Sequence, residues 1–457
     1  MRLMVRAENI QTVSAAVQRG ADFVAVPMLP TRSRILAEET EYARARGVKL
    51  FTELDGAIAD NHLTDVLKLA AVSARCGADG LILGDLGVYS AVRKILPDIP
   101  VIAGSRLTVS SCGGTQALAE LGFCGAFISS GIGGYELERI VNNSPIDVII
   151  ADKPEAALVK ILPALYDSGR AVLLPRVENT GQEENTALVT EYFSVAIRER
   201  RNIRASEIKN LNGKLPLTAI RAALLSGEIR PAEEHSPKPR YRGGEFLPPS
   251  VKPEEPKRRP QISVSVTNPE LLTHALIKLA PLILYIPVDV ILADPQKIAA
   301  FAQNGKTRIC AAIPAGEYDF TALEQLKPLD IYTLLISDAG HIAPALKAGF
   351  KLRADFGIEV RNSQTLQLLR ELGFESACIS EDTPHHEIAE MFKYLPIEVR
   401  YHDDIRKSRY GITWLRTSFD KETERECTGR LKRILTVLGL SSRPLLRAVW
   451  NFLLKSE

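Results

Sequence analysis

Two stretches of this sequence, 251 positions apart, are nearly the same. Laid side by side without a gap, residues 103–129 and 354–380 agree at 11 of 27 positions and share the run Glu-Leu-Gly-Phe. The segments before them also correspond, LILGDLG at 81–87 with LLISDAG at 334–340. A repeat of this length indicates a duplicated domain, so we expect the two halves of the chain to share one architecture.

The first half alternates short apolar runs with segments of helical periodicity. Eight strand candidates rich in Val, Ile or Leu follow one another: RLMVR, ADFVAVP, VKLFTEL, GLILGD, PVIAGS, GAFISS, PIDVIIAD and AVLLPR. Between them lie helical segments that end at Gly or Pro, such as LTDVLKLAAVSARCG. This alternation predicts a (β/α)8 barrel of the TIM-barrel type for residues 1–176, although an open doubly wound sheet shares the same order.

The remaining chain divides into four segments. Residues 177–230 lose the alternation and are expected to form an irregular or helical connector. Residues 231–260 contain eight prolines with mixed charge, which predicts a flexible linker. From 261 to 405 the alternation resumes with ISVSV, LILYIPVDVIL, RICAAIP, YTLLISD, LRADF, SACIS and IEVRYH, which predicts a second, smaller barrel-like domain.

The last segment, residues 406–457, is basic. It contains 12 Lys or Arg against 5 Asp or Glu, and GRLKRILTVLGL and RPLLRAVWNFLLK have the pattern of amphipathic helices. The simplest interpretation is a helical tail packed against the second barrel with its basic face in solvent. Binding to RNA, to an acidic protein partner or to a membrane surface are the alternatives.

The overall composition limits the class of protein. With 46% hydrophobic and 25% charged residues the chain is expected to be globular, and its net charge of +2 predicts no strong overall attraction to nucleic acid or membranes. No signal peptide and no membrane-spanning run are recognisable, so a cytoplasmic location is expected. The six cysteines include no C-x-x-C pair, and we expect no metal site from their spacing.

In an α/β barrel, reactive groups lie at the carboxyl ends of the strands. In the first half this rule selects Glu53, Asp55, Asp85, Ser105, Arg106, Ser129, Asp152 and Arg176. Asp55, Asp85 and Arg106 are the catalytic candidates, and the others are candidates for substrate binding. Acids opposite arginines would clamp an anionic or sugar-containing substrate. Asp85 and Asp152 are also well placed to cap the helices that follow them.

The second half offers fewer candidates at its strand ends: Asp338, Asp355, Glu359, Asn362 and His402. His402 is the catalytic candidate, because a neighbouring Asp would hold its imidazole for acid–base work. Asn362 is simply interpreted as a helix N-cap, and a lone His is more often structural. No motif for a nucleophile or a P-loop is present, and GIGGY at 131–135 lacks the dinucleotide-binding spacing.

Several stretches resemble one known family. RGADFVAVPM, ARARGVKLFTEL and the run from GADGLILGDLG to ALAELGF resemble the barrel of the collagenase-like peptidases, peptidase family U32, and the second half resembles the second barrel of its longer members. The family name implies proteolysis by a hydrolase. The resemblance also implies hydroxylation of transfer RNA, ribosomal RNA or a ubiquinone precursor, with an iron-sulfur cluster and, for RNA modification, prephenate as oxygen donor.

The sequence departs from this family at the expected cluster ligands. Ala151 and Asp152 stand where the family has His-Gly before a cysteine-rich segment, and no cysteine lies between Cys124 and Cys310. His402 matches a family histidine, yet no cysteine follows closely. Cluster ligation commonly takes four thiolates, so the sequence assigns no cofactor.

Three functions remain compatible with these residues. The chain is an enzyme of the family that acts on RNA, a peptide or a small aromatic substrate at the first barrel. Alternatively, it is a catalytically inactive binding or scaffold partner of a cluster-bearing relative. The third alternative is a cluster-free lyase or hydrolase acting on a small anionic substrate, which rests on analogy of fold alone.

Overall fold

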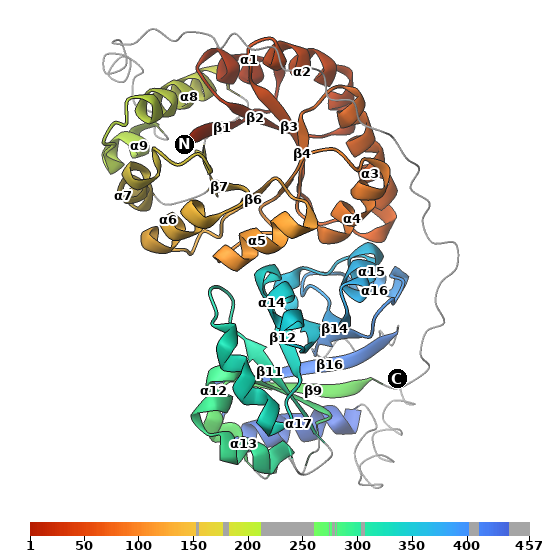
Figure 1. Cartoon of the computed structure of the whole chain (residues 1–457). Coiled ribbons are helices and arrows are strands. Elements are labelled where there is room, and N and C mark those ends of the chain that lie inside the picture. The colour runs from red at the N-terminus through yellow and green to blue at the C-terminus, as the bar shows by residue number, and fades with distance from the viewer. Residues whose placement is uncertain are drawn as a thin grey trace. The chain divides into compact units, whose positions relative to one another are not determined.

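The strands of the computed structural model close into two parallel eight-stranded barrels, β1 to β8 and β9 to β16 (Figure 1). One unit comprises Met1–Pro248 and the other Pro249–Glu457. The structure describes residues 1–151, 155–176, 182–211, 260–401 and 411–437, apart from residues 274, 277, 278, 280 and 303–306. The predicted fold class, two (β/α) barrels related by duplication, is confirmed.

Every strand of the first barrel falls inside one of the eight predicted runs. The strands are β1 (Arg2–Arg6), β2 (Phe23–Pro27), β3 (Lys49–Leu54), β4 (Gly80–Leu83), β5 (Val101–Ala103), β6 (Gly125–Phe127), β7 (Asp147–Ala151) and β8 (Ala171–Leu174). The helices are η1 (Pro30–Arg34, a 3-10 helix), α1 (Ile10–Gln18), α2 (Leu36–Arg44), α3 (Asp60–Arg75), α4 (Leu86–Ile95), α5 (Cys112–Leu121), α6 (Gly134–Asn143), α7 (Glu155–Leu165), α8 (Glu183–Arg198) and α9 (Ala205–Leu211).

Several of these helices begin where a short polar side chain satisfies the first backbone amides. The side chains of Asn9, Asp85 and Ser111 each accept a hydrogen bond from the amide three residues further on, at 2.9 to 3.0 Å. Helix α5 ends at Gly122, whose φ of 97° belongs to the left-handed region that glycine adopts without strain. Local sequence therefore fixes where these helices begin and end.

The interior of the first barrel is apolar. Its buried core comprises Met4, Phe23, Ala25, Phe51, Ile82, Ile102, Phe127, Ile149, Ala151, Val172 and Leu174. Because these side chains fill the barrel, as in other barrels of this type, polar chemistry is confined to the loops at the strand ends.

The first barrel extends beyond the predicted boundary at residue 176. Helix α8 lies against α1 and β1, and its buried side chains include Val189, Phe193 and Ala196. It therefore supplies the helix after β8, in a segment for which the sequence analysis predicts an irregular or helical connector. The alternation is hard to see in the sequence because eight residues separate the end of β8 at Leu174 from the start of α8 at Glu183.

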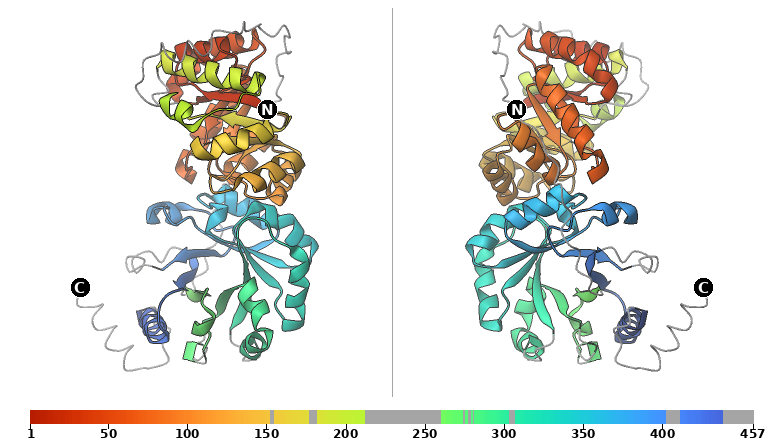
Figure 2. Two further views of the ribbon diagram at one scale, coloured as in Figure 1. Left: turned by 90° about the vertical axis from the view of Figure 1, so that its left-hand side faces the viewer. Right: turned by 90° about the vertical axis from the view of Figure 1, so that its right-hand side faces the viewer.

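The second barrel has the same strand–helix order, and Figure 2 shows in each unit that the helices lie outside the strands. Its strands are β9 (Gln261–Val266), β10 (Ile283–Pro287), β11 (Arg308–Ile313), β12 (Thr333–Ile336), β13 (Lys351–Ala354), β14 (Phe374–Cys378), β15 (Ile397–Arg400) and β16 (Ile412–Phe419). The helices are α12 (Val288–Ala293), α13 (Pro295–Ala302), α14 (Ile342–Lys347), α15 (Ser363–Glu371), α16 (His385–Glu390) and α17 (Glu424–Val437). Short 3-10 helices are η2 (Pro269–Leu271), η3 (Phe320–Leu329), η4 (Ala339–His341) and η5 (Phe356–Ile358).

Strand β16 corrects the predicted boundary at residue 405. It pairs with β15 and β9 and closes the barrel, although the sequence analysis placed it in a helical tail. Polar side chains conceal it in the sequence, because Arg416 and Thr417 are buried at positions where a barrel strand ordinarily has an apolar residue. The second barrel therefore has eight strands rather than the seven that were predicted.

The predicted linker at 231–260, apart from residue 260, and the last helical segment of the predicted tail lie outside the described residues. Helix α17 is described and buries Cys427, Leu431 and Ile434. No helix in the described part of the chain has the length and apolar character needed to cross a membrane.

Candidate functional site in the first barrel and its counterpart in the second

The carboxyl ends of β1 to β8 form a face that we call the first mouth. Asp55, which follows β3, extends to the end of β5, where the Ser105 amide and hydroxyl donate hydrogen bonds to Oδ2 at 2.7 and 2.6 Å. The other carboxylate oxygen, Oδ1, is buried and has no hydrogen-bond partner in the described part of the chain. An unpaired buried carboxylate oxygen is costly, and such atoms are often functional.

Two glycines make this position of Asp55 possible. A Cβ atom at Gly84 or at Gly104 would overlap Oδ1 of Asp55, so the side chain can lie against the ends of β4 and β5 only because both positions lack one. Neither glycine has the positive φ that marks a left-handed backbone. Their role is close approach of a side chain rather than backbone conformation.

Replacing Gly104 by alanine is expected to displace Asp55 from Ser105, because the new methyl group needs the place of Oδ1. The expected loss is about 1–3 kcal/mol of unfolding free energy, the usual range for breaking hydrogen bonds to a charged group. Denaturant unfolding of the full chain measures it. Gly133→Ala is the control, because a Cβ there meets no atom within 4 Å; equal stability of the two variants would contradict the assignment.

Basic side chains lie on the neighbouring strands of the first mouth. Arg6, at the end of β1, donates from Nε to Glu53 Oε1 at 2.9 Å, and its guanidinium carbon lies 5.9 Å from the ring centre of Phe127. Strands β1 and β8 pair in register at Leu3 and Leu173, and continuing this register places the exposed Arg176 level with Arg6. Two arginines at one level suit a carboxylate or phosphate group.

The other predicted residues of the first half have different outcomes. Asp85 is the N-cap of α4 and only 3% exposed, so its described contact is structural. Ser129 is half-buried, and its amide donates to the carbonyl of Val109 at 2.9 Å. Arg106 is half-buried beside Ser105, while Asp152 lies outside the described residues.

Of the residues predicted in the second half, two are helix caps, one pairs with an arginine and one lies outside the described residues. Asp338 and Asn362 are helix N-caps, accepting from Gly340 and Thr365 at 2.8 and 3.0 Å. Glu359, in the left-handed region at φ 56°, pairs with Arg361. His402 lies outside the described residues, so its predicted catalytic role stays a prediction.

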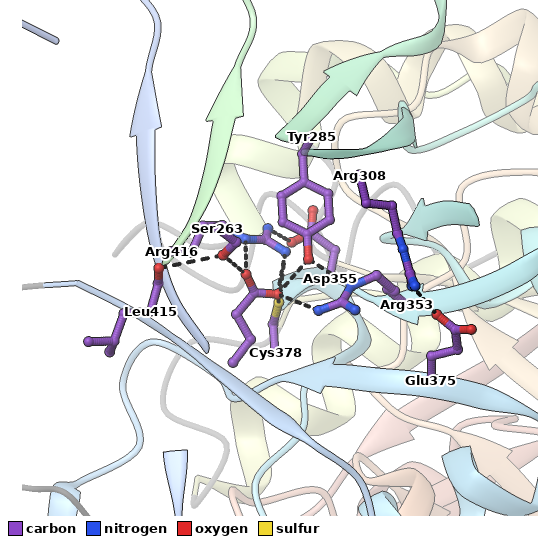
Figure 3. A network of polar contacts seen from close by, with 10 residues as sticks. Ser263, Tyr285, Arg308, Arg353, Asp355, Glu375, Cys378, Leu415 and Arg416 are labelled. Carbon is purple, nitrogen blue, oxygen red and sulfur yellow. Dashed lines mark hydrogen bonds and ion pairs between the residues drawn. The ribbon is translucent and has the colours of Figure 1, made fainter. Parts of the chain in front are cut away.

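A network of charged side chains occupies the interior of the second barrel (Figure 3). At its centre is Glu398 on β15, which is fully buried and accepts hydrogen bonds from Tyr285 at 2.8 Å and from Nη2 of Arg416 at 3.1 Å. The hydroxyl of Ser263 also donates to Glu398. Arg353 donates from Nε to the Tyr285 hydroxyl at 2.8 Å and lies 3.8 Å from Glu398.

The two arginines determine the charge of this network. Burial by itself would raise the pKa of Glu398, but the charges of Arg416 and Arg353 outweigh it and lower the pKa to about 2. Burial raises the pKa of Tyr285 well above its ordinary value, and the negative charge of Glu398 adds to this. The network therefore holds an ionised carboxylate, two guanidiniums and a neutral phenol.

Strand registers relate this network to the apolar core of the first barrel. The repeat aligns Ala103 with Ala354. From this pair, the residues paired between neighbouring strands can be followed around each barrel, and both directions match the same residues of the two barrels. The second-barrel residues Ser263, Tyr285, Cys310, Arg353, Cys378, Glu398, Trp414 and Arg416 match Met4, Ala25, Phe51, Ile102, Phe127, Ile149, Val172 and Leu174. At several of these positions the second barrel therefore has a charged or polar residue where the first has an apolar one, while Cys310 and Trp414 stay within a hydrophobic cluster.

Most of these residues were missed in the sequence because they lie inside strands rather than at their ends. The available signal was a charge within an otherwise apolar run, as in KLRA and IEVR. Of the residues that the sequence analysis selected, Asp355 belongs to the network. It accepts hydrogen bonds from Nη1 of Arg416 at 2.5 Å and from the Ser337 hydroxyl at 3.0 Å.

The cysteines do not fit the cluster that the family resemblance implies. All six are described and none forms a disulfide; Cys310 and Cys378 are buried in the second-barrel interior, and Cys427 is a buried residue of α17. Among the described residues, no three His, Cys, Asp or Glu side chains gather as metal ligands would. We therefore derive no chemistry through an iron-sulfur cluster.

Comparisons with solved structures return other barrel proteins at low identity. Thiamine phosphate pyrophosphorylase from Pyrococcus furiosus is 18% identical over 43% of this chain and 96% of its own, with a TM-score of 0.31. Orotidine 5'-monophosphate decarboxylase from Methanocaldococcus jannaschii is 14% identical over 43% of this chain and 98% of its own, with a TM-score of 0.32. These likenesses carry no argument about function.

The comparison by family is more specific. No curated protein matches the sequence. Residues 8–150 match the profile of peptidase family U32, and the matched segment runs from the loop after β1 to β7. The matched segment includes Asp55, Ser105 and the two glycines against which Asp55 packs, Gly84 and Gly104. The match supports membership of the chain in peptidase family U32.

Proposed function

We propose that the first barrel is the catalytic domain of a divergent enzyme of this family, and that it binds a small organic anion at the first mouth. The single observation that carries the proposal is the carboxylate of Asp55, fixed through Oδ2 by Ser105 and unpaired at Oδ1. A positioned carboxylate of this kind is suited to transfer a proton to or from a bound substrate.

The arginines supply the binding part of the proposed mechanism. Arg6 and Arg176 would hold a carboxylate or phosphate of the substrate, with the guanidinium of Arg6 oriented by Glu53. Asp55 would then act as general base or acid on a group bound beside the anion. The reaction classes that fit are lyase and hydrolase chemistry, while RNA, a quinone precursor and peptide stay alternative substrates of the same mouth.

The second barrel is proposed to be a non-catalytic copy. By register, Ser265, Ser418 and Ala312 take the places of Arg6, Arg176 and Glu53. Asp355, the predicted strand-end carboxylate that belongs to the network, accepts a hydrogen bond from Arg416. A binding role for the tail at 406–457, with RNA or a related protein as partner, stays a prediction.

Thermal-shift screening of carboxylates and phosphates, followed by titration calorimetry on the full chain, tests this proposal. Arg6→Met is expected to weaken binding of the best anion about tenfold or more, the usual size of a hydrogen bond to a charged group. Collagen-derived peptide, RNA and the best anion are then compared as substrates with Asp55→Asn, which should remove turnover.

Arg2→Met is a matched control, because Arg2 begins the same strand and has the same kinds of partner. Arg2 pairs with Asp147, lies over the ring of Phe23, and is 34% exposed against 36% for Arg6. Arg2 lies at the amino end of β1, away from the first mouth. Equal loss of anion binding in both variants, or turnover that survives Asp55→Asn, would refute the proposal.

A further inference from the structure

The two barrels hold a carboxylate at the same place by different routes. In the first barrel Asp55 crosses from β3 and puts Oδ1 where a Cβ of Gly104 would lie. In the second barrel the aligned residue is Asp355, whose own side chain starts at that Cβ. A serine hydroxyl donates to each carboxylate, from Ser105 and from Ser337 respectively. The position of the negative charge is thus maintained in both copies.

The two carboxylates differ in their second oxygen. Asp355 Oδ1 accepts a hydrogen bond from the guanidinium of Arg416 at 2.5 Å, whereas Asp55 Oδ1 has no partner in the described part of the chain. The residue that corresponds to Arg416 by register is Leu174, a buried side chain of the apolar core. Leucine has no donor, so the first barrel lacks the cation that the second barrel supplies from its own eighth strand.

We propose that the ligand of the first barrel supplies this missing group, and that it carries a protonated amine or guanidinium in addition to its anion. The inference rests on the proposed function and narrows its ligand to a zwitterion. Pairing would relieve the cost of a buried carboxylate oxygen without a hydrogen bond. It would also place the cationic nitrogen beside the carboxylate proposed to transfer the proton, while Arg6 and Arg176 hold the anionic end.

Two matched probes separate this inference from the proposed function. Guanidinoacetate carries a guanidinium and a carboxylate, whereas N-carbamoylglycine has the same shape and carboxylate with a neutral urea. Titration calorimetry on the full chain is expected to give a dissociation constant about tenfold lower for guanidinoacetate, the effect of one hydrogen bond to a charged partner. Asp55→Asn should remove this preference, and Arg6→Met should weaken both probes equally.

Asp147→Asn is the control, because it neutralises a carboxylate at the amino end of β7 and should leave the preference unchanged. Thermal unfolding of each variant shows whether it is folded. Equal affinity of the unsubstituted protein for both probes would overturn the inference while leaving the anion site intact, and would assign the place beside Asp55 to water. Binding of neither probe, together with no carboxylate or phosphate found by screening, would overturn the proposed function and this inference with it.

Discussion

Replacing Glu398 by alanine is expected to lower the free energy of unfolding by about 3–5 kcal/mol, the usual consequence of removing one partner of a buried ion pair. The change leaves Arg416 and Arg353 in the interior of the second barrel without their common carboxylate, and each is 3% exposed. It also removes the acceptor of Tyr285. Chemical denaturation monitored by circular dichroism measures the loss.

The control for this prediction is Glu375→Ala. Glu375 lies on the neighbouring strand and pairs with Arg308 and Lys351, whose side chains are exposed, so its removal is expected to change stability by no more than about 1 kcal/mol. If the two variants lost the same stability, the interior network would not be a determinant of the second barrel.

The Glu398 carboxylate also contributes to the free energy of unfolding of the unsubstituted protein, and acid removes this contribution. Its pKa in the folded state is about 2, below the ordinary 4.5, so the contribution is complete above pH 4.5 and declines as the pH falls toward 2. The shift corresponds to roughly 3 kcal/mol. Stability measured across this pH range should therefore fall less steeply in Glu398→Ala than in the unsubstituted protein.

Replacing Arg32 by methionine is expected to have a comparable effect on the first barrel. Arg32 forms two hydrogen bonds with Glu39, at 3.0 and 2.8 Å, and their side chains are 4% and 0% exposed. It also donates to the carbonyl of Glu8 at 2.6 Å, which joins the loop after β1 to the loop after β2. Leaving Glu39 buried without its partner should cost about 3–5 kcal/mol.

The double variant Arg32→Met with Glu39→Leu tests the cause. Because it removes both charges, it is expected to be more stable than Arg32→Met alone, as apolar replacements of buried ion pairs generally are. Denaturant unfolding of the single and double variants provides the comparison. A double variant that is less stable than the single one would show that shape rather than charge determines the loss.

The strands of the first barrel could be predicted because each is a short apolar run bounded by turn residues, and this pattern is local. The same reasoning failed at β16, where Arg416 and Thr417 interrupt the apolar pattern. The guanidinium of Arg416 is tolerated in the interior because Glu398 and Asp355 accept its hydrogen bonds. These two partners come from other strands, so no local pattern indicates them.

The candidate site was predictable to a similar degree. The rule that chemistry lies at strand ends selected Asp55 and Ser105, and the structure joins them. It selected Asp85 with equal weight, although its described contact caps a helix. Arg6 was missed, because a charged residue at the end of the first short strand does not by itself indicate a mouth residue.

The sequence by itself determined the duplication, the strand–helix order and the helix caps, because these depend on periodicity and on contacts within a few residues. Only the tertiary structure decided that Asp55 lies against Gly84 and Gly104 at the ends of β4 and β5, and that Arg416 pairs with Asp355 in the second barrel. Closing a barrel brings residues from distant strands to one level, and the register that sets this level is a property of the whole sheet.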